Sequence, residues 1–490
     1  MSLRVFNVLG REKVDFKPIE PGRVTMYVCG PTVQDYSHLG HAKTYISFDL
    51  INRYLRYSGN EVLYVQNITD VGHLLDTGED RIIKKAKQTA AGSSAQPAAL
   101  PMQIVESYAK AYFDDMDALG IQRPDISPRA SAHIPEQIEM IQTLLKNENA
   151  YIADDGVYFD VSSHDGYGKL SNRKRDESET GSRTLKGRGK RNPEDFVLWV
   201  IAPPEHLLKW DSPWGKGYPG WHIECSAMSR KYLGETFDIH GGGIDNIFPH
   251  NECECAQSEA ANGKPFANHW LLTGSLTVNG VKMSKSLGNF TRVRDALEKY
   301  RPEVIRAWVF QTHYSNPVDY SDDALAAAQK GWEGIMGAVR LTREALRSAQ
   351  DSEAGSGFLA VIDQTKAQFI EAMDNDFNAP VAMSVLQTFT TEVNKLLNSG
   401  ETVGKATLEA IEALYNELGG TVLGIVPAIE ATSNADAKRQ DGLIRLLIDL
   451  RQQSRAEKQF ARADQIRNQL KALGVILEDR ADGSIYKLEN

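Results

Sequence analysis

The chain has 490 residues, of which 41% are hydrophobic and 24% charged, and it carries a formal net charge of −10 at pH 7. This length predicts about two to four domains, and the composition is typical of a water-soluble globular protein. No apolar run approaches the ~20 residues that a membrane-spanning helix needs, and residues 1–5 lack the apolar core of a signal peptide. Four cysteines are too few for a secreted disulfide framework. We therefore expect a cytoplasmic protein without membrane contacts.

Residues 24–41 form the first informative stretch. Val24–Val28 is a short apolar run rich in β-branched residues, which predicts a buried strand. Cys29 stands at its end, Gly30-Pro31 predicts a turn, and His38-Leu39-Gly40-His41 leads into a predicted helix over 42–49. A helix start with a glycine and two imidazoles can present N–H groups and cations to phosphate. Taken alone, a cysteine at a strand end is more often a small buried hydrophobe than a ligand, and such a tetrapeptide recurs by chance.

The region up to about residue 110 alternates strand-like and helical patterns. Glu61–Ile68 predicts a second strand, and Thr69 follows it directly. Strands that alternate with helices predict a parallel α/β sheet whose ligands gather at the carboxyl ends of the strands. Residues 89–101 are rich in small residues and predict a surface loop.

The next region is predicted to be helical and then β-structured, with strand patterns at 150–153 and 156–161. A basic segment follows over 172–191, with eight Lys or Arg residues against three acidic ones. It has no apolar periodicity and predicts a loop. A solvated charged loop is the more common explanation of such a run, and a contact with RNA phosphates is the alternative.

Several potential metal ligands stand between residues 220 and 260. His250 and Glu254 are four residues apart, so on a helix they project from one face. Without further partners, such a pair is usually an ordinary surface hydrogen bond. Cys253 and Cys255 also compete as ligands, but positions two apart on a helix face different sides and cannot both join His250. If the fold brings them together, four residues would form a tetrahedral zinc site: Cys29, Cys225, His250 and Glu254.

The segment Lys282-Met283-Ser284-Lys285-Ser286 is the sharpest motif of the chain. It is flanked by glycine and serine, which predicts a loop. Two ammonium groups on such a loop suit a clamp that neutralises a polyphosphate. A merely solvated loop is the weaker explanation.

Amphipathic helices are predicted beyond residue 300, over 324–349, 362–373 and 379–397, and a Gly/Thr/Pro-containing patch at 419–434 separates a last unit. Residues 431–490 carry 11 basic and 9 acidic residues, whereas the rest of the chain is acidic. A basic unit on an acidic protein is what a second RNA contact would look like, and a merely solvated helix face is the alternative. One helix face is expected to carry Arg451, Arg455, Lys458 and Arg462. The opposite, core-facing stripe is expected to carry Ala456, Phe460, Ala463, Ile466 and Leu470.

Together these motifs resemble a known family. His38–His41 and Lys282–Ser286 are similar to the two signature sequences of class I aminoacyl-tRNA synthetases. Four further segments resemble the cysteinyl-tRNA synthetase family: Met26–Thr32, Gly220–Cys225, Asp238–Gly243 and Phe248–His250. The resemblance extends to the C-terminal Leu473–Asp479. The sequence departs from the family pattern at Gln34, where an aromatic residue is usual, in Asn251–Glu254 and Thr69–His73, and in the basic segment.

The resemblance implies an α/β fold with three parts. A Rossmann-like parallel-sheet catalytic domain is expected over 1–300, with an inserted connective segment at about 110–220. A stem-contact region and α-helical bundle are expected over 301–425, and a small C-terminal anticodon-binding domain over 426–490. A monomer is expected.

The resemblance also implies a cysteine–tRNA ligase that uses ATP with Mg²⁺, L-cysteine and tRNA(Cys), with one Zn²⁺ per chain bound to the substrate thiolate. The implied catalytic residues are His38, His41, Lys282 and Lys285. The implied ATP-binding residues are Gly40, His41, Gly242, Asp245 and Lys285. The implied amino-acid pocket is Thr69, Trp221 and His240, and the implied zinc ligands are the four residues given above.

Two other functions stay open at the level of sequence. A ligase that joins cysteine to an amino sugar would share the adenylate chemistry, but it resembles only the catalytic part of the chain. A non-catalytic tRNA-binding paralogue is disfavoured by the intact pairs of histidines and lysines in the two signatures.

Overall fold

A computed structural model describes residues 2–72, 100–173, 189–204, 206–283, 288–428, 435–480 and 483–488. Its contacts divide the chain into two units, Met1–Val426 and Pro427–Asn490. Within the described residues, no helix has both the length and the apolar character needed to cross a membrane.

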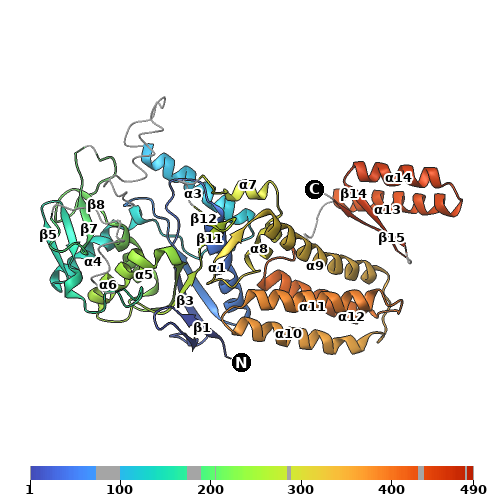
Figure 1. Ribbon diagram of the computed structural model, residues 1–490, viewed down its shortest axis with the longest axis horizontal. Coiled ribbons are helices and arrows are strands. Elements are labelled where there is room, and N and C mark those ends of the chain that lie inside the picture. The colour runs from blue at the N-terminus through green and yellow to red at the C-terminus, as the bar shows by residue number, and fades with distance from the viewer. Residues whose placement is uncertain are drawn as a thin grey trace. The chain divides into compact units, whose positions relative to one another are not determined.

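A four-stranded parallel sheet lies at the centre of the first unit (Figure 1). In spatial order its strands are β10 (Ala267–Thr273), β9 (Phe237–Gly243), β3 (Arg23–Val28) and β4 (Glu61–Gln66). All neighbouring pairs are parallel, so the carboxyl ends of the four strands lie along one edge. The predicted strands at 24–28 and 61–68 are confirmed, although β4 ends two residues early.

Helix α1 (Leu39–Tyr57) follows β3 and packs its apolar side chains into the core beneath the sheet. The predicted helix over 42–49 is therefore confirmed and extended at both ends. A Cβ atom added to Gly241 of β9 would lie 2.3 Å from the Phe48 ring of α1. A glycine at this position is what allows the helix and the strand to approach each other so closely.

The segment between β4 and β9 carries helices and a second sheet. The helices are α3 (Leu100–Ala118), α4 (Ile134–Lys146) and α5 (Trp221–Leu233). The antiparallel sheet has the order β5 (Ala150–Ala153), β6 (Gly156–Phe159), β7 (Phe196–Ile201) and β8 (Gly217–Pro219). The strand patterns at 150–153 and 156–161 are confirmed, with β6 ending at Phe159.

Two predicted loops fall largely outside the described residues. Residues 89–99 of the first are not described, and its last two residues, Leu100 and Pro101, already belong to α3. Residues 174–188 of the basic segment lie outside the description as well.

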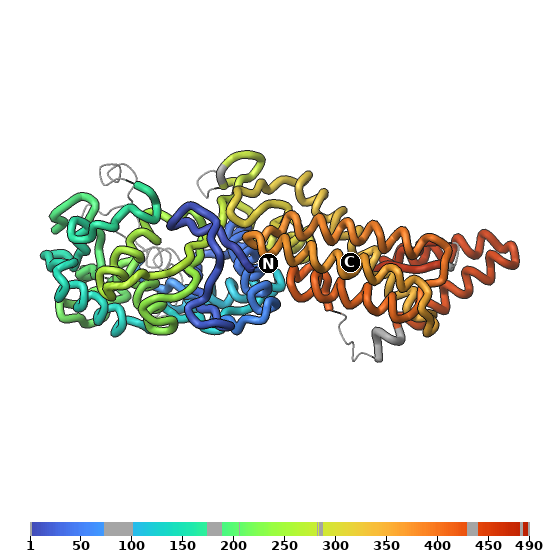
Figure 2. Tube along the Cα trace, turned by 90° about the horizontal axis from the view of Figure 1, so that it is seen from below, coloured from blue at the N-terminus to red at the C-terminus, as the bar shows by residue number. Residues whose placement is uncertain are grey.

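Short elements join the sheet to the helical part. The hairpin β1 (Arg4–Asn7) and β2 (Glu12–Asp15) precedes β3, and α6 (Glu252–Asn262) follows the turn after β9. After β10 come β11 (Leu276–Val278), β12 (Val281–Lys282), α7 (Val293–Leu297), α8 (Pro302–Val309) and β13 (Val318–Tyr320). The helices α9 (Asp322–Ser348), α10 (Leu359–Asp374), α11 (Ala379–Leu397) and α12 (Lys405–Leu414) then lie side by side (Figures 1 and 2). The three helices predicted for this region are confirmed.

The second unit contains α13 (Ala435–Ala456), α14 (Phe460–Ala472), β14 (Val475–Arg480) and β15 (Gly483–Leu488). The predicted continuous basic helix face is wrong, because α13 ends before Lys458, whose φ of 59° is left-handed. Arg451 is 3% exposed and donates to Asp479 at 2.6 and 2.7 Å instead of facing solvent. Ala456 and Phe460, expected in the core, are exposed, whereas Ala463 and Leu470 are buried as predicted.

Candidate active site

Four potential metal ligands from distant parts of the chain meet in one buried cluster. Cys29 comes from the end of β3, Cys225 from α5, His250 from the turn after β9, and Glu254 from α6. Their ligand atoms all lie within 4.8 Å of one another, and all four residues are buried. The fold thus brings together the four residues that the sequence singled out as candidate ligands.

The donor types of this cluster and two of its distances fit zinc, whereas Nε2 of His250 and Oε1 of Glu254 are in direct contact at 2.5 Å. Sγ of Cys29 lies 3.5 Å from Oε1 of Glu254, and Sγ of Cys225 lies 3.6 Å from Nε2 of His250. Two ligands of a tetrahedral zinc ion with bonds of about 2.0–2.3 Å lie roughly 3.3–3.8 Å apart. Two thiol sulfurs with an imidazole and a carboxylate also form a donor set that suits zinc.

Neither competing cysteine belongs to the cluster. Sγ of Cys253 faces the Tyr167 hydroxyl at 3.7 Å, and Sγ of Cys255 contacts Oε1 of Glu259 at 3.5 Å. The two thiols thus point to different sides of α6. Both cysteines are buried and contribute to separate parts of the core.

The candidate ligands are themselves held by neighbouring side chains. His240 Nε2 lies 2.5 Å from Oε2 of Glu254, and the Asn251 amide donates to Sγ of Cys29 at 3.6 Å. Nδ1 of His222 lies 3.1 Å from Nδ1 of His250. Contacts of this kind orient metal ligands and raise metal affinity.

The electrostatics of the cluster reflect its burial and its close charges. Burial raises the pKa of the Cys225 thiol, and contacts with Cys29 and Glu254 raise it further. Burial lowers the pKa of His250, but Glu254 and Cys225 outweigh this and raise it to about 10. Burial likewise opposes the charge of Glu254, but His250 and His240 hold its pKa below the ordinary range. A cation in this position would compete with the proton on His250.

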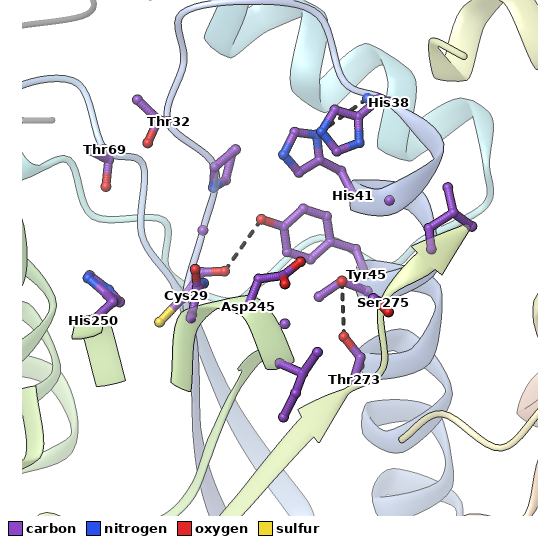
Figure 3. A pocket seen from close by; sticks show the side chains of 18 of the residues that line it. Cys29, Thr32, His38, His41, Tyr45, Thr69, Asp245, His250, Thr273 and Ser275 are labelled. Carbon is purple, nitrogen blue, oxygen red and sulfur yellow. Dashed lines mark hydrogen bonds between the residues drawn. The ribbon is translucent and has the colours of Figure 1, made fainter. Parts of the chain in front are cut away.

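A cavity of about 590 Å³ opens from this cluster and extends to the start of α1. Cys29, Cys225 and His250 line it on one side, and His38, Gly40 and His41 on the other. Figure 3 shows Cys29, His250 and Thr69 at one side, the two histidines of α1 opposite, and Asp245 between them. One cavity can therefore hold a ligand that reaches from the thiols to the imidazoles.

The two histidines stand at the first turn of α1. Their rings are stacked with centroids 3.9 Å apart, and the backbone N–H of His38 donates to Nδ1 of His41 at 3.3 Å. A Cβ added to Gly40 would lie 3.0 Å from the His38 ring and 3.1 Å from Met283. A larger residue than glycine would crowd both neighbours.

Of the residues expected in the amino-acid pocket, Thr69 and Trp221 line the cavity. The Thr69 hydroxyl donates to Oε2 of Glu224 at 3.1 Å, and the Trp221 indole stacks on His250 with ring centroids 4.3 Å apart. His240 is fully buried behind Glu254, where its ring stacks on Trp270 at 4.1 Å. Its place in the structure is therefore that of a support for Glu254.

The residues expected to bind ATP have different places. Asp245 lines the cavity, as does Gly243, the neighbour of Gly242. Gly242 itself lies beside Cys29, whose Cβ would be 3.7 Å from a Cβ added there. Lys285 and the side chain of Lys282 lie outside the described residues, but Met283, between the two, lines the cavity.

The cavity wall also contains residues that the sequence did not single out. Tyr45 donates to the Cys29 carbonyl oxygen at 3.4 Å, and the hydroxyls of Thr44 and Thr273 lie 3.0 Å apart. The other such lining residues include Thr32, Asp35, Asn67, Asn246 and Ser275. Most of them follow the carboxyl ends of parallel strands, so the rule that ligands gather there was the available signal.

Two family models match the chain. The model described as tRNA synthetases class I (C) catalytic domain matches residues 15–330, and the DALR domain model matches residues 368–427.

Full-length relatives share the name cysteine–tRNA ligase. The one from Chlorobaculum tepidum is 44% identical over 497 residues, covering 99% of each chain. The one from Deinococcus radiodurans is 45% identical and covers 99% of this chain and 97% of its own. The one from Thermus thermophilus is 42% identical and covers both chains completely.

Solved structures of similar fold are more distant in sequence. Methionyl-tRNA synthetase of Mycobacterium tuberculosis with methionyl-adenylate has a TM-score of 0.56 at 15% identity, covering 82% of this chain and 89% of its own. The LeuRS–tRNA–LeuAMS complex of Agrobacterium radiobacter has a TM-score of 0.60 at 11% identity, covering 84% and 85%. At such identities the similarity shows a shared fold, which confirms the expected α/β class with its parallel sheet.

Proposed function

The chain belongs to the cysteine–tRNA ligase family of class I aminoacyl-tRNA synthetases, and from this premise we propose how its residues carry out the reaction. The family's reaction joins cysteine and ATP to cysteinyl-adenylate with release of pyrophosphate, then transfers cysteine to the 3′-terminal ribose of tRNA(Cys). The observation that supports our assignment most directly is that one and the same cavity is lined by three residues of the candidate metal cluster and by the two signature histidines.

We assign the amino-acid end of the cavity to the cluster of Cys29, Cys225, His250 and Glu254. These four residues would hold one Zn²⁺, while His240 and His222 orient Glu254 and His250. When bound, zinc supplies a soft site that prefers a thiolate to a hydroxyl, which separates cysteine from the nearly isosteric serine. Trp221 and Thr69 would enclose the rest of the amino acid.

We assign the opposite end to ATP, which enters with Mg²⁺. His38, Gly40 and His41 would bind its phosphates from the start of α1, where N–H groups and imidazoles converge. Asp245 and Gly242 would hold the nucleoside, because Gly242 is the penultimate residue of β9 and Asp245 follows the carboxyl end of this strand. For Lys282 and Lys285 the support is the signature motif itself, which suits a clamp that neutralises the phosphates during attack by the cysteine carboxylate.

We propose that the remaining parts dock tRNA(Cys). In this division residues 1–300 catalyse, 301–425 contact the stem, and 426–490 bind the anticodon. Exposed Phe460, Arg462 and Arg467 on α14 support the last role, because aromatic rings and guanidinium groups stack well on unpaired bases. The four free cysteines suit a reducing cytoplasm, where we expect the chain to act as a monomer.

Charging of purified tRNA(Cys) with cysteine tests this function, because neither a cysteine–amino-sugar ligase nor a non-catalytic paralogue would do it. The zinc assignment is tested by Cys29→Ser, which should lose the metal as measured by atomic absorption. Stoichiometric zinc in that variant would refute Cys29 as a ligand, and absence of charging by the zinc-loaded wild-type chain would refute the function.

A further inference from the structure

The loop that presents the two signature histidines is held from outside the cavity by the segment before α7. The backbone N–H of Leu39 donates to the Thr291 carbonyl oxygen at 3.0 Å, and that of Val293 donates to the Ser37 carbonyl oxygen at 2.9 Å. These two hydrogen bonds flank a β-bridge between His38 and Arg292. The start of α1 therefore depends on where residues 291–293 lie.

Arg294 adds a side-chain contact to this backbone pairing. Its guanidinium carbon lies 3.8 Å from the centroid of the Tyr36 ring. The Tyr36 ring also contacts Tyr108 of α3, which meets it edge-on with ring centroids 5.2 Å apart. Tyr36 itself lines the cavity two residues before His38.

The guanidinium is in turn fixed by a buried carboxylate. Nη2 of Arg294 donates to Oδ1 of Asp115 at 2.9 Å, and the Asp115 side chain is only 6% exposed. A carboxylate with so little access to water depends on its paired cation, so Arg294 has a defined position instead of the many rotamers of an exposed arginine. The contacts join three separate segments: the α1 loop, α3 and α7.

We propose that Arg294 is a positioning residue for adenylate formation, which sets the place of His38 and His41 through Tyr36 and through residues 291–293. This rests on the proposed function of the two histidines. Arg294 is not assigned a contact with the reactants. It acts by holding the imidazoles where the phosphates of ATP would lie, and a displacement of about 1 Å at such a position can reduce a rate by about 100-fold.

The chain offers a matched control. Arg123 forms a similar arrangement, with hydrogen bonds of 2.9 and 2.6 Å to Asp117 and its guanidinium carbon 4.8 Å from the centroid of Phe113. This arginine is 57% exposed and none of its contacts reaches the α1 loop. Substituting Arg123 also removes an arginine–aspartate pair and a cation–aromatic contact, but at a place away from the α1 loop.

The test compares Arg294→Gln with Arg123→Gln in cysteine-dependent ATP–pyrophosphate exchange, using the zinc-loaded full chain. Arg294→Gln should lower kcat about tenfold or more, with zinc content and the KM for cysteine unchanged, while Arg123→Gln keeps the wild-type kcat. Asp115→Asn should have a similar effect, and the double variant should be no slower than either single one, because both changes break one contact. Arg294→Lys should recover only part of the rate, since an ammonium keeps the charge but not the flat stack.

A wild-type kcat in Arg294→Gln would overturn the proposal, as would an equal loss in Arg123→Gln. If Arg294→Gln does not fold, Tyr36→Leu keeps the ion pair and removes only the ring, and it must then show the fall in kcat. No exchange by the wild-type chain would instead refute the proposed function, so the two failures are distinguishable.

Discussion

His240 should control the affinity of the metal site although it is not one of the four ligands. Its Nε2 lies 2.5 Å from Oε2 of Glu254, while Nε2 of His250 lies 2.5 Å from Oε1. His240→Phe keeps a flat ring against Trp270 but removes the hydrogen-bond donor, which leaves one buried carboxylate oxygen without this partner. Loss of such a contact lowers metal affinity about 10- to 100-fold, or about 1.4–2.7 kcal/mol.

The assay is competition for zinc with a chromogenic chelator. His269→Phe is the control, because His269 is also a buried histidine, lies on the neighbouring strand β10 and contacts the Asp238 carbonyl oxygen at 3.1 Å, away from the cluster. His240→Gln retains an N–H donor and should lose less affinity than His240→Phe. If His240→Phe and His269→Phe have the same zinc affinity, Glu254 needs no support from His240.

Three further outcomes are expected. Zinc affinity should rise between about pH 6 and 8, because metal-free His250 holds a proton that the bound metal displaces. Glu254 and Cys225 raise the pKa of His250 to about 10, although burial opposes this. Calorimetry in buffers of different ionisation enthalpy measures the protons released on zinc binding, and no release would contradict the prediction. Arg306→Leu should lower the free energy of unfolding in urea by about 3–5 kcal/mol, because Nη2 of Arg306 lies 2.7 Å from fully buried Asp49; a loss equal to that of exposed Arg123→Gln would contradict it. Lys285→Ala should slow pyrophosphate exchange by about 100-fold or more while cysteine binding persists, and unchanged exchange would remove Lys285 from the mechanism.

Individual strands and helices could be predicted because each one is encoded by the spacing of apolar residues within its own segment. The apolar run at 24–28 became β3, and the spacing of apolar residues at 379–397 became α11 with the same bounds. The clustering of four candidate ligands was also accessible to prediction, since Cys29, Cys225, His250 and Glu254 are metal-binding residue types and three of them lie within family-like segments. Residue type and spacing carry this information without any knowledge of how the strands are ordered.

Long-range pairing is what the sequence could not supply. The strand next to β3 on one side is β9, more than 200 residues later, and their register places Tyr27 opposite His240. That register directs His240 behind Glu254 and not into the cavity, because neighbouring residues of a strand point to opposite faces. In the second unit, α13 ends at Ala456, and the left-handed backbone of Lys458 lies between this helix and α14. The spacing of the basic residues along the chain gave no sign of this break.

The departure at Gln34 can now be interpreted through the loop that contains it. At one end of this loop, a Cβ on Gly30 would lie 1.5 Å from the Asn67 carbonyl oxygen, so the chain there is pressed against the end of β4. At the other end, Leu39 is hydrogen-bonded to Thr291. Gln34 lies between these fixed ends on the cavity wall, and its backbone N–H donates to the Thr32 carbonyl oxygen at 2.9 Å. Since none of these contacts uses its side chain, Gln34 contributes to the cavity lining but does not itself hold Cys29 or His38 in place.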